Sequence, residues 1–142
     1  MGIGNQIRGD DAIGLEIVRM LRGKVPDKVK IIECGLAPEN FIGEIIRFKP
    51  THILLIDAAH LGDDPGEAKL IRPDRIQRTI FWTHKLPLYV LSNLIRRSID
   101  AEIRLLGVQP KVLDLREGLS PELEEAKGKV AAIIIEALKR IY

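Results

Sequence analysis

The sequence predicts an α/β fold, a three-layer αβα sandwich around a mostly parallel twisted sheet. Short runs rich in β-branched residues alternate with stretches of helical periodicity, which is typical of βα units. The run over residues 51–57 is apolar without alternation, which indicates a strand that is buried on both faces. The 142 residues contain no linker, repeat or low-complexity stretch, so residues 1–142 are expected to form a single domain.

The first half of the chain predicts two helices and two strands. Residues 11–22 predict a helix, because apolar side chains recur on one face and carboxylates stand at its positive end. Residues 29–33 predict a short buried strand. Residues 38–48 predict a second helix, which Pro50 ends. Residues 51–57 are then the most clearly predicted strand of the sheet.

The second half predicts two more strands and two more helices. A turn over residues 63–66 precedes an edge strand over residues 68–71. Pro87 suits the first turn of a helix that runs to about residue 98. Residues 103–108 predict a buried strand, and Ser120 is the expected cap of an amphipathic helix that runs to about residue 140.

The start of the chain departs from the βα pattern. A strand is expected before the glycine-containing turn Gly2-Ile3-Gly4-Asn5, yet only Met1 precedes it. The first strand is therefore expected to be missing from this chain. Two explanations stay open: a natural chain that begins earlier, or a strand supplied by another chain. The missing strand would be central, so its absence is expected to expose strand edges.

Composition excludes several classes of function. The net charge of +2 gives no nucleic-acid footprint, and no apolar run is long enough for membrane insertion. The single cysteine, Cys34, fits a reducing cytoplasm. Abundant Ile, Lys, Arg and Glu with few Asn and Gln favour a thermophile source. The oligomeric state is not predicted.

Three side chains far apart in the sequence are expected to meet. Asp11, Asp57 and His84 each stand where a predicted strand gives way to a loop or a helix. In an open parallel sheet such positions fall at the carboxyl edge, where ligand clefts form. Two carboxylates and an imidazole would suit a metal ion of hard to intermediate character.

Each of these residues also has a simpler interpretation. Asp11, with its neighbour Asp10, can cap a helix; Asp57 can form an Asx turn; and His84 can be an ordinary surface histidine. The glycines near residue 4 do not complete a dinucleotide fingerprint, and two carboxylates at the helix start would repel a pyrophosphate.

The remaining candidates are weaker. His60 follows Asp57 by three residues and is kept as a residue near the site, whereas His52 opens a strand at the opposite end. Cys34 is more readily explained as a small buried residue than as a nucleophile. The sequence contains neither a His-Glu-x-x-His zinc motif nor a Gly-x-Ser-x-Gly elbow.

Taken together, the motifs resemble those of the hydrogenase maturation endopeptidases, especially the type that serves the hydrogenase of formate hydrogenlyase. The resemblance covers essentially the whole chain after the missing strand. The matching blocks are Gly2-Ile3-Gly4-Asn5, Arg8-Gly9-Asp10-Asp11-Ala12-Ile13-Gly14, Gly35-Leu36-Ala37-Pro38-Glu39-Asn40, Leu54-Leu55-Ile56-Asp57-Ala58, Gly62-Asp63-Asp64-Pro65-Gly66-Glu67, Thr83-His84-Lys85-Leu86-Pro87-Leu88 and Leu106-Gly107-Val108-Gln109-Pro110.

The resemblance implies a function. Such enzymes remove a short C-terminal peptide from the large-subunit precursor of a nickel–iron hydrogenase after nickel insertion. It implies an aspartic-type endopeptidase in which Asp11, Asp57 and His84 are both the catalytic and the metal-contacting residues. The nickel is carried by the substrate, and other divalent metals can substitute in vitro. Whether nickel is catalytic or only a recognition gate stays open. A non-catalytic, Rossmann-like module that binds a small ligand or a metal is the alternative.

Overall fold

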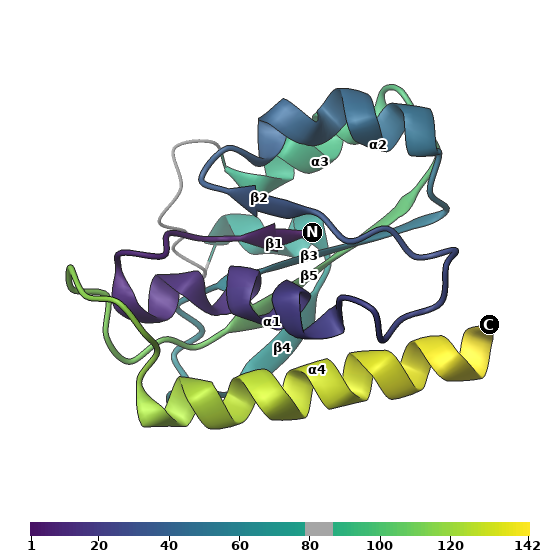
Figure 1. Cartoon of the computed structure of the whole chain (residues 1–142). Helices are drawn as coiled ribbons and strands as arrows, with labels where there is room; N and C mark the ends of the chain where they lie inside the picture. Colours follow the sequence, from purple (N-terminus) through teal and green to yellow (C-terminus); the bar gives the residue numbers. More distant parts are fainter. Residues whose placement is uncertain (79–86) are drawn as a thin grey trace.

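A mixed sheet with helices on both faces forms the centre of the molecule (Figure 1). The structure, a computed structural model, describes residues 1–78 and 87–142. Within these residues the strands form one five-stranded sheet of order β2-β1-β3-β5-β4. The strands are β1 (Gly2–Ile3), β2 (Glu33–Gly35), β3 (His52–Ala58), β4 (Ala68–Ile71) and β5 (Glu102–Val108). β4 is antiparallel to β5 and the other pairings are parallel, which confirms a mostly parallel sheet with β4 at its edge.

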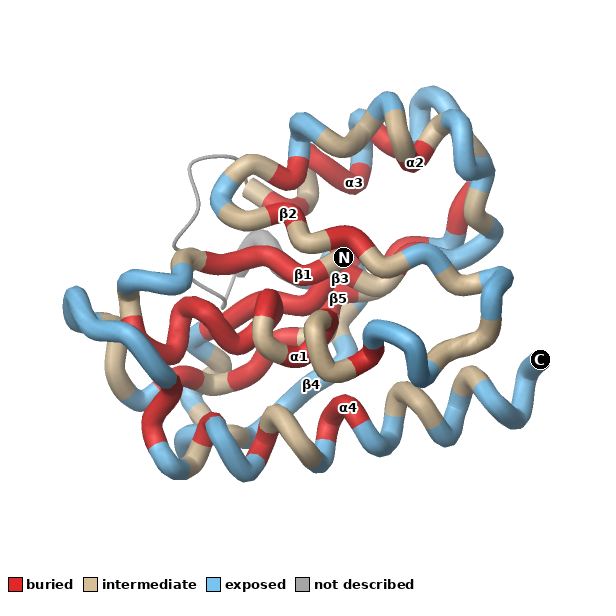
Figure 2. Tube along the Cα trace, in the orientation of Figure 1, coloured by how far each residue is buried: buried red, intermediate tan, exposed pale blue. Residues whose placement is uncertain are grey.

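Two pairs of helices cover the two faces of the sheet. Helices α1 (Ile13–Leu21) and α4 (Pro121–Ile141) lie on one face, and helices α2 (Ile42–Phe48) and α3 (Leu88–Arg96) lie on the other (Figure 1). Each face has its own apolar core, one with Ile17 and Leu123 and the other with Leu55 and Leu91. The buried residues concentrate on β1, β3 and α1 (Figure 2). The three predicted layers are therefore present.

Most predicted elements are found within a few residues of their expected bounds, and the clearest difference concerns β2. The strand expected over residues 29–33 is instead Glu33–Gly35. Its partner β1 covers only Gly2–Ile3, and pairing with it begins where the Gly2 N–H donates to the Ile32 carbonyl at 2.8 Å. Without a longer β1 beside them, residues 29–31 have no ladder to join, so their apolar character alone does not make a strand.

Two of the predicted helices begin with a 3₁₀ segment instead of an α-helical turn. Three-residue-per-turn segments precede two α-helices: η1 (Gly9–Ala12) leads into α1 and η2 (Pro38–Phe41) leads into α2. A third such segment, η3 (Pro73–Arg78), follows β4. Asp11 therefore lies on η1 rather than on the α-helix proper, which leaves it at the junction with the sheet.

The parallel strands give the sheet two different ends. β1, β2, β3 and β5 all finish on one side, the carboxyl edge, and all begin on the other, the amino edge. β1 lies between β2 and β3 and consists of Gly2–Ile3, which the sequence assigned to a turn. The first strand is therefore present as two residues rather than wholly missing. None of the described helices is both long enough and apolar enough to cross a membrane.

Candidate functional site at the carboxyl edge

Two glycines let η1 and α1 approach the sheet closely. A side chain at Gly4, where φ is +152°, would collide with the backbone carbonyl of Asp11. A side chain at Gly14 would collide with the carbonyl groups of Ile3 and Ile56. Because neither glycine has a Cβ, the backbone of η1 and of the first turn of α1 can rest directly on the ends of β1 and β3. This contact brings Asp11 to the carboxyl edge.

The Asp11 carboxylate is held by the turn that follows β1. The side chain is 2% exposed, and its Oδ2 accepts a hydrogen bond from the Asn5 backbone N–H at 3.1 Å. A buried carboxylate is tolerated only where donors or cations compensate the loss of water. The turn Gly4–Asn5, which the sequence singled out for its glycines, therefore supplies a donor to a carboxylate rather than to a phosphate.

The Asp57 carboxylate lies at the end of the most buried strand. Asp57 is fully buried and is the next-to-last residue of β3, in register with Gly107 of β5. Its Oδ1 accepts a hydrogen bond from the Ala58 backbone N–H at 2.8 Å. Residues of η1 contact β3, so Asp11 and Asp57 lie on adjoining elements at the same edge of the sheet. The predicted placement of both aspartates at the carboxyl edge agrees with the structure.

Asp10, one residue before Asp11, has a different environment. Its carboxylate is fully buried and accepts from the backbone N–H groups of Lys111, Val112 and Ser120 at 2.9, 2.9 and 2.7 Å. The Ser120 hydroxyl also donates to it, at 2.8 Å. With four donors this carboxylate is an anchor for the loop between β5 and α4. The Ser120 side chain, expected to cap α4, binds Asp10 instead.

Of the three histidines, the structure describes His52 and His60 but not His84. His84 lies outside the described residues, so its predicted position in the site is not tested. Helix α3, which follows these residues in the sequence, begins at Leu88. His60 is exposed and follows β3 by two residues, on the side of Asp57. His52 opens β3 at the amino edge, as expected, and its Nδ1 lies 2.9 Å from the Thr51 hydroxyl.

The described residues do not by themselves form a complete metal site. Within residues 1–78 and 87–142, no group of three or more His, Cys, Asp or Glu side chains is arranged to hold a metal ion. Two carboxylates on adjoining elements are a partial donor set.

Cys34 is not suited to a nucleophilic role. The residue is buried at β2, and burial raises the pKa of its thiol to about 11. The reactive form of cysteine is the thiolate, which is scarce at neutral pH when the pKa is this high. The interpretation of Cys34 as a small buried residue agrees with its position in the core.

Three exposed apolar residues at the carboxyl edge, here called the rim, were not predicted from the sequence. Ile7 follows β1, Leu36 follows β2 and Leu115 follows β5, and their exposed fractions are 55%, 56% and 80%. Backbone hydrogen bonds join the loops that bear Ile7 and Leu115: the Arg116 N–H donates to the Ile7 carbonyl at 3.0 Å, and the Gly9 N–H donates to the Arg116 carbonyl at 2.9 Å. No periodicity in the sequence marks these three residues as exposed, because each lies in a loop.

Comparison with known proteins places the chain in a family. The sequence model of the family HycI, described as hydrogenase maturation protease, matches residues 15–137. The chain belongs to the hydrogenase maturation protease family. Hydrogenase 3 maturation protease of Escherichia coli K12 is 31% identical over 125 residues, which cover 87% of this chain and 80% of that protein.

Solved structures of hydrogenase maturation proteases share the fold. The crystal structure of the NiFe hydrogenase maturation protease HycI from Thermococcus kodakarensis KOD1 has a TM-score of 0.90 and 36% identity, over 97% of this chain and 89% of that chain. The hydrogenase maturating endopeptidase HybD of E. coli has a TM-score of 0.82 and 26% identity, over 98% and 90%.

These matches confirm the resemblance, the fold class and the enzyme class. The chain is a peptidase, which sets aside the alternative of a non-catalytic binding module. The assignment of Asp11, Asp57 and His84 as the catalytic and metal-contacting residues stays a prediction.

Proposed function

We propose that this protease removes a C-terminal peptide from the large-subunit precursor of a nickel–iron hydrogenase after nickel has been inserted. Family membership combined with one structural observation carries the proposal: the Asp57 carboxylate is fully buried at the carboxyl edge of the sheet, beside the element that bears Asp11. Substrate clefts of open α/β sheets form at this edge.

In the proposed reaction Asp57 is the general base. It takes a proton from a water molecule, the water oxygen attacks the carbonyl carbon of the scissile peptide bond, and the proton passes to the leaving amine as the C–N bond breaks. Asp11, held by the Asn5 N–H, orients the same water or the substrate. This assignment corresponds to an aspartic-type hydrolysis in which the chain's own carboxylates move the proton.

Nickel enters the proposal as part of the substrate. The precursor carries the ion, and Asp11 and Asp57, together with His84 from the segment before α3, would contact it. Carboxylate and imidazole are suitable donors for such an ion, which could also polarise the scissile carbonyl. In this proposal the nickel of the precursor serves as a recognition gate, because the ion arrives with the substrate.

The rim of the carboxyl edge supports a protein as the substrate. Ile7, Leu36 and Leu115 present large apolar side chains on loops that backbone hydrogen bonds hold in place. Gly35, beside Leu36, has φ +60° and open space where a side chain would stand. An extended peptide could lie against these residues with its scissile bond near Asp57, and exposed apolar side chains are typical of surfaces that bind other proteins.

The test is a cleavage assay read by intact mass. A hydrogenase large-subunit precursor, with or without nickel, is incubated with the chain or with its Asp57→Asn variant. The proposal expects loss of a C-terminal peptide from the nickel-loaded precursor only, and none with the variant. The matched control is Asp64→Asn, which changes an exposed aspartate in the turn before β4 and should cleave normally. Equal cleavage by the Asp57 variant would refute the assignment of the base.

A further inference from the structure

Gln109 is the first residue after β5, and it joins that strand to both ends of the loop between β3 and β4. Its side-chain Oε1 accepts a hydrogen bond from the Leu61 backbone N–H at 2.6 Å, near the start of the loop. At the end of the loop, the Gln109 N–H donates to the Glu67 carbonyl at 2.8 Å, and the Gly66 N–H donates to the Gln109 carbonyl at 2.9 Å. One residue thus holds the loop of residues 59–67 at the carboxyl edge of the sheet.

The side-chain amide of Gln109 fits this place in one orientation. Its Nε2 donates to the Pro110 carbonyl at 3.2 Å, while its Oε1 receives the Leu61 N–H. If the amide were turned over, its oxygen would face the Pro110 carbonyl and its N–H groups would face the Leu61 N–H. The carboxylate of a glutamate has the same length and could still accept from Leu61, but it could not donate to Pro110. The site therefore selects an acceptor at one position of the side chain and a donor at the other.

The start of the loop lies directly over β5. A side chain at Gly107 would approach the Ala59 Cβ to 2.9 Å, which is too close, and the Leu61 Cδ2 to 3.4 Å. Since Gly107 is in register with Asp57, the loop lies across the pair of strands that bears the proposed base. The hydrogen bond between Leu61 and Gln109 holds the loop in this position.

His60 is the residue whose position depends most directly on Gln109. The strand itself holds Asp57, which pairs within the β3–β5 ladder. His60 lies two residues beyond the strand, and the backbone N–H groups of its two neighbours donate to the end of β5. One of these bonds, from Ala59 to the Val108 carbonyl at 2.9 Å, involves backbone alone. The other needs the Gln109 side chain, so loss of that side chain would free one end of the segment that carries His60.

We propose that Gln109 is a positioning residue, which holds the exposed His60 imidazole on the loop after the proposed base so that it contacts the precursor. The inference rests on the proposed function, since it adds a contact to the same substrate. A neutral imidazole carries one N–H donor and one acceptor, so it can bind the backbone amides of an extended peptide. Loss of a binding contact of this kind raises KM more than it lowers kcat.

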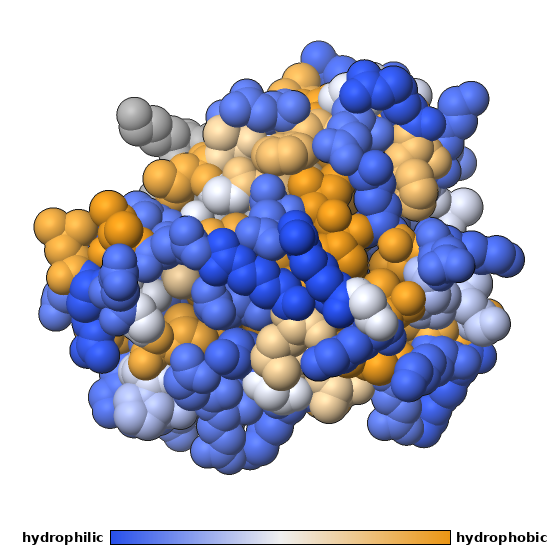
Figure 3. Space-filling view, viewed as in Figure 1, coloured by the Kyte–Doolittle hydropathy of each residue, from blue (hydrophilic) through white to orange (hydrophobic). Residues whose placement is uncertain are grey.

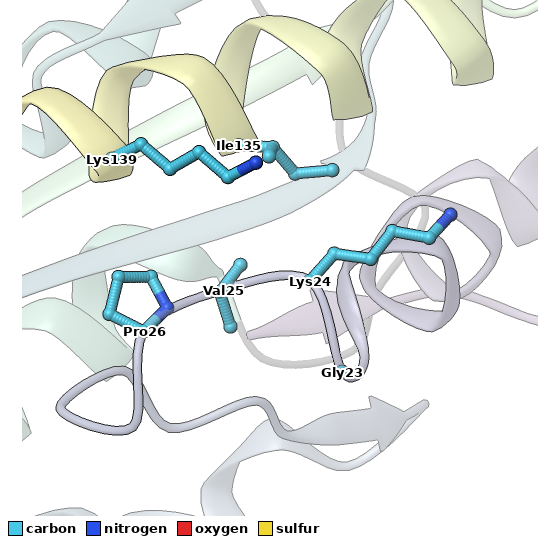
Figure 4. Close-up of a pocket in the computed structure, with 6 residues that line it drawn as sticks. All are labelled: Gly23, Lys24, Val25, Pro26, Ile135 and Lys139. Carbon is cyan, nitrogen blue, oxygen red and sulfur yellow. The ribbon is translucent and has the colours of Figure 1, made fainter.

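Two hollows elsewhere in the described residues do not show what they would bind. An apolar groove of about 670 Å³ lies at the amino edge, and part of its surface is visible between α2 and the lower half of the molecule (Figure 3). The residues that line this groove include Met1, Ile45, Phe48, Leu54, Ile134 and Leu138. A second, open hollow lies between the turn after α1 and helix α4, where Lys24 and Lys139 lie beside Val25, Pro26 and Ile135 (Figure 4). Apolar surface alone does not identify an occupant, and two surface lysines on an open hollow do not make an anion site.

The test compares two variants that keep the length of the Gln109 side chain. Gln109→Met removes both hydrogen bonds of the amide, whereas Gln109→Glu keeps the acceptor for Leu61. With nickel-loaded precursor as substrate, Gln109→Met should raise KM about tenfold, as expected for the loss of one hydrogen bond, and change kcat by less than about twofold. Gln109→Glu should restore most of the parent KM. Amide exchange at Leu61 should be faster in Gln109→Met than in Gln109→Glu, and melting curves confirm that both chains are folded at the assay temperature.

A double-mutant cycle tests whether Gln109 acts through His60. His60→Ala should raise KM by about the same factor as Gln109→Met, and combining the two changes should raise it no further. The matched control is His52→Ala, because His52 is an exposed histidine at the amino edge and should leave KM unchanged.

Two results of these assays would overturn the inference. One is a parent KM for Gln109→Met together with faster exchange at Leu61, which would mean that the substrate does not depend on the position of the loop. The other is an additive effect in the double variant, which would mean that Gln109 does not act through His60.

A binding measurement separates this inference from the proposed function. Calorimetry in the Asp57→Asn background gives the Kd of the intact precursor without cleavage. If the parent binds the precursor but does not cleave it, the proposed reaction fails, whereas a Kd raised about tenfold by Gln109→Met still supports the positioning role. An equal Kd with and without Gln109→Met, or no binding by the parent, would overturn the contact with the precursor.

Discussion

The two edges of the sheet differ in their packing: buried polar groups are hydrogen-bonded at the carboxyl edge, whereas an apolar groove stays open at the amino edge. At the carboxyl edge, the Asp10 carboxylate receives four hydrogen bonds and fixes the loop between β5 and α4. At the amino edge, a groove of about 670 Å³ remains, with a charged amine in its wall. The comparison teaches that side chain-to-backbone hydrogen bonds order the loops at the carboxyl edge, whereas the amino edge keeps an open apolar groove.

The largest effect is expected at Asp57. Asp57→Asn keeps the size of the side chain and its acceptor oxygen but removes the negative charge, so the fold should persist while peptide removal slows by about 10³-fold, a typical value for loss of a general base. Single-turnover cleavage of nickel-loaded precursor, followed by intact mass, measures the rate. If Asp57→Asn retained the parent rate, the carboxyl edge would have a structural role only.

The next largest effect is expected at Asp10, and it concerns the free energy of unfolding. Asp10→Ala should reduce the free energy of unfolding by about 3 kcal/mol or more, because it leaves several buried N–H donors without an acceptor. Asp10→Asn keeps one acceptor oxygen for these donors and should cost clearly less. Urea denaturation of the two variants measures the difference. Equal losses would mean that the acceptor oxygens do not carry the stabilisation.

A smaller effect is expected at the rim. Leu115→Ser replaces a side chain that is 80% exposed, so the free energy of unfolding should change by less than about 0.5 kcal/mol. The KM for the precursor should rise several-fold with little change in kcat, since the residue would contribute to substrate binding alone. The exposed Leu94 of α3 offers a control, because Leu94→Ser lies away from the rim and should leave the KM unchanged.

The smallest effect is the pH dependence of stability that the Met1 amine contributes at the amino edge. Burial lowers the pKa of the Met1 amine from its ordinary value of 8.0. Between the lowered pKa and about pH 8 the unfolded chain binds more protons than the folded chain, so stability should rise with pH in that window and level off above it. Denaturation at several pH values measures the slope, and acetylation of the Met1 amine should abolish it.

The interpretation of that slope takes account of neighbouring groups. The charged or titratable side chains around the groove and the amine are Lys28, Lys30, Cys34, Glu44, His52, Glu102 and Arg104. Acetylation of the Met1 amine removes its charge and leaves these side chains unchanged. A slope that persists in the acetylated chain would therefore belong to these groups and not to Met1.

The sequence determined the order of the elements and the edge at which the aspartates lie. Apolar periodicity is a local property, so residues 51–57 and 103–108 could be assigned as buried strands without knowledge of their partners. Parallel connections then place the ends of such strands at one edge, which brought Asp11 and Asp57 to the same side of the sheet before any contact was known.

Only the tertiary structure showed what the Asp10 carboxylate binds. Asp10 and Asp11 are both buried and adjacent in the sequence. The backbone groups that donate to Asp10 lie about a hundred residues away in the sequence. Side chain-to-backbone contacts of such long range have no periodicity and leave no pattern in the sequence.

The tertiary structure likewise decided the position of β2. Residues 29–31 have the composition of a strand, but a strand needs a neighbour with which to exchange hydrogen bonds, and the two residues of β1 provide one only from Ile32 onward. The sequence by itself therefore determined the elements, the family and the edge that bears the aspartates. The ladder of the sheet decided where β2 begins and where the groove opens, because pairing depends on which backbone lies alongside.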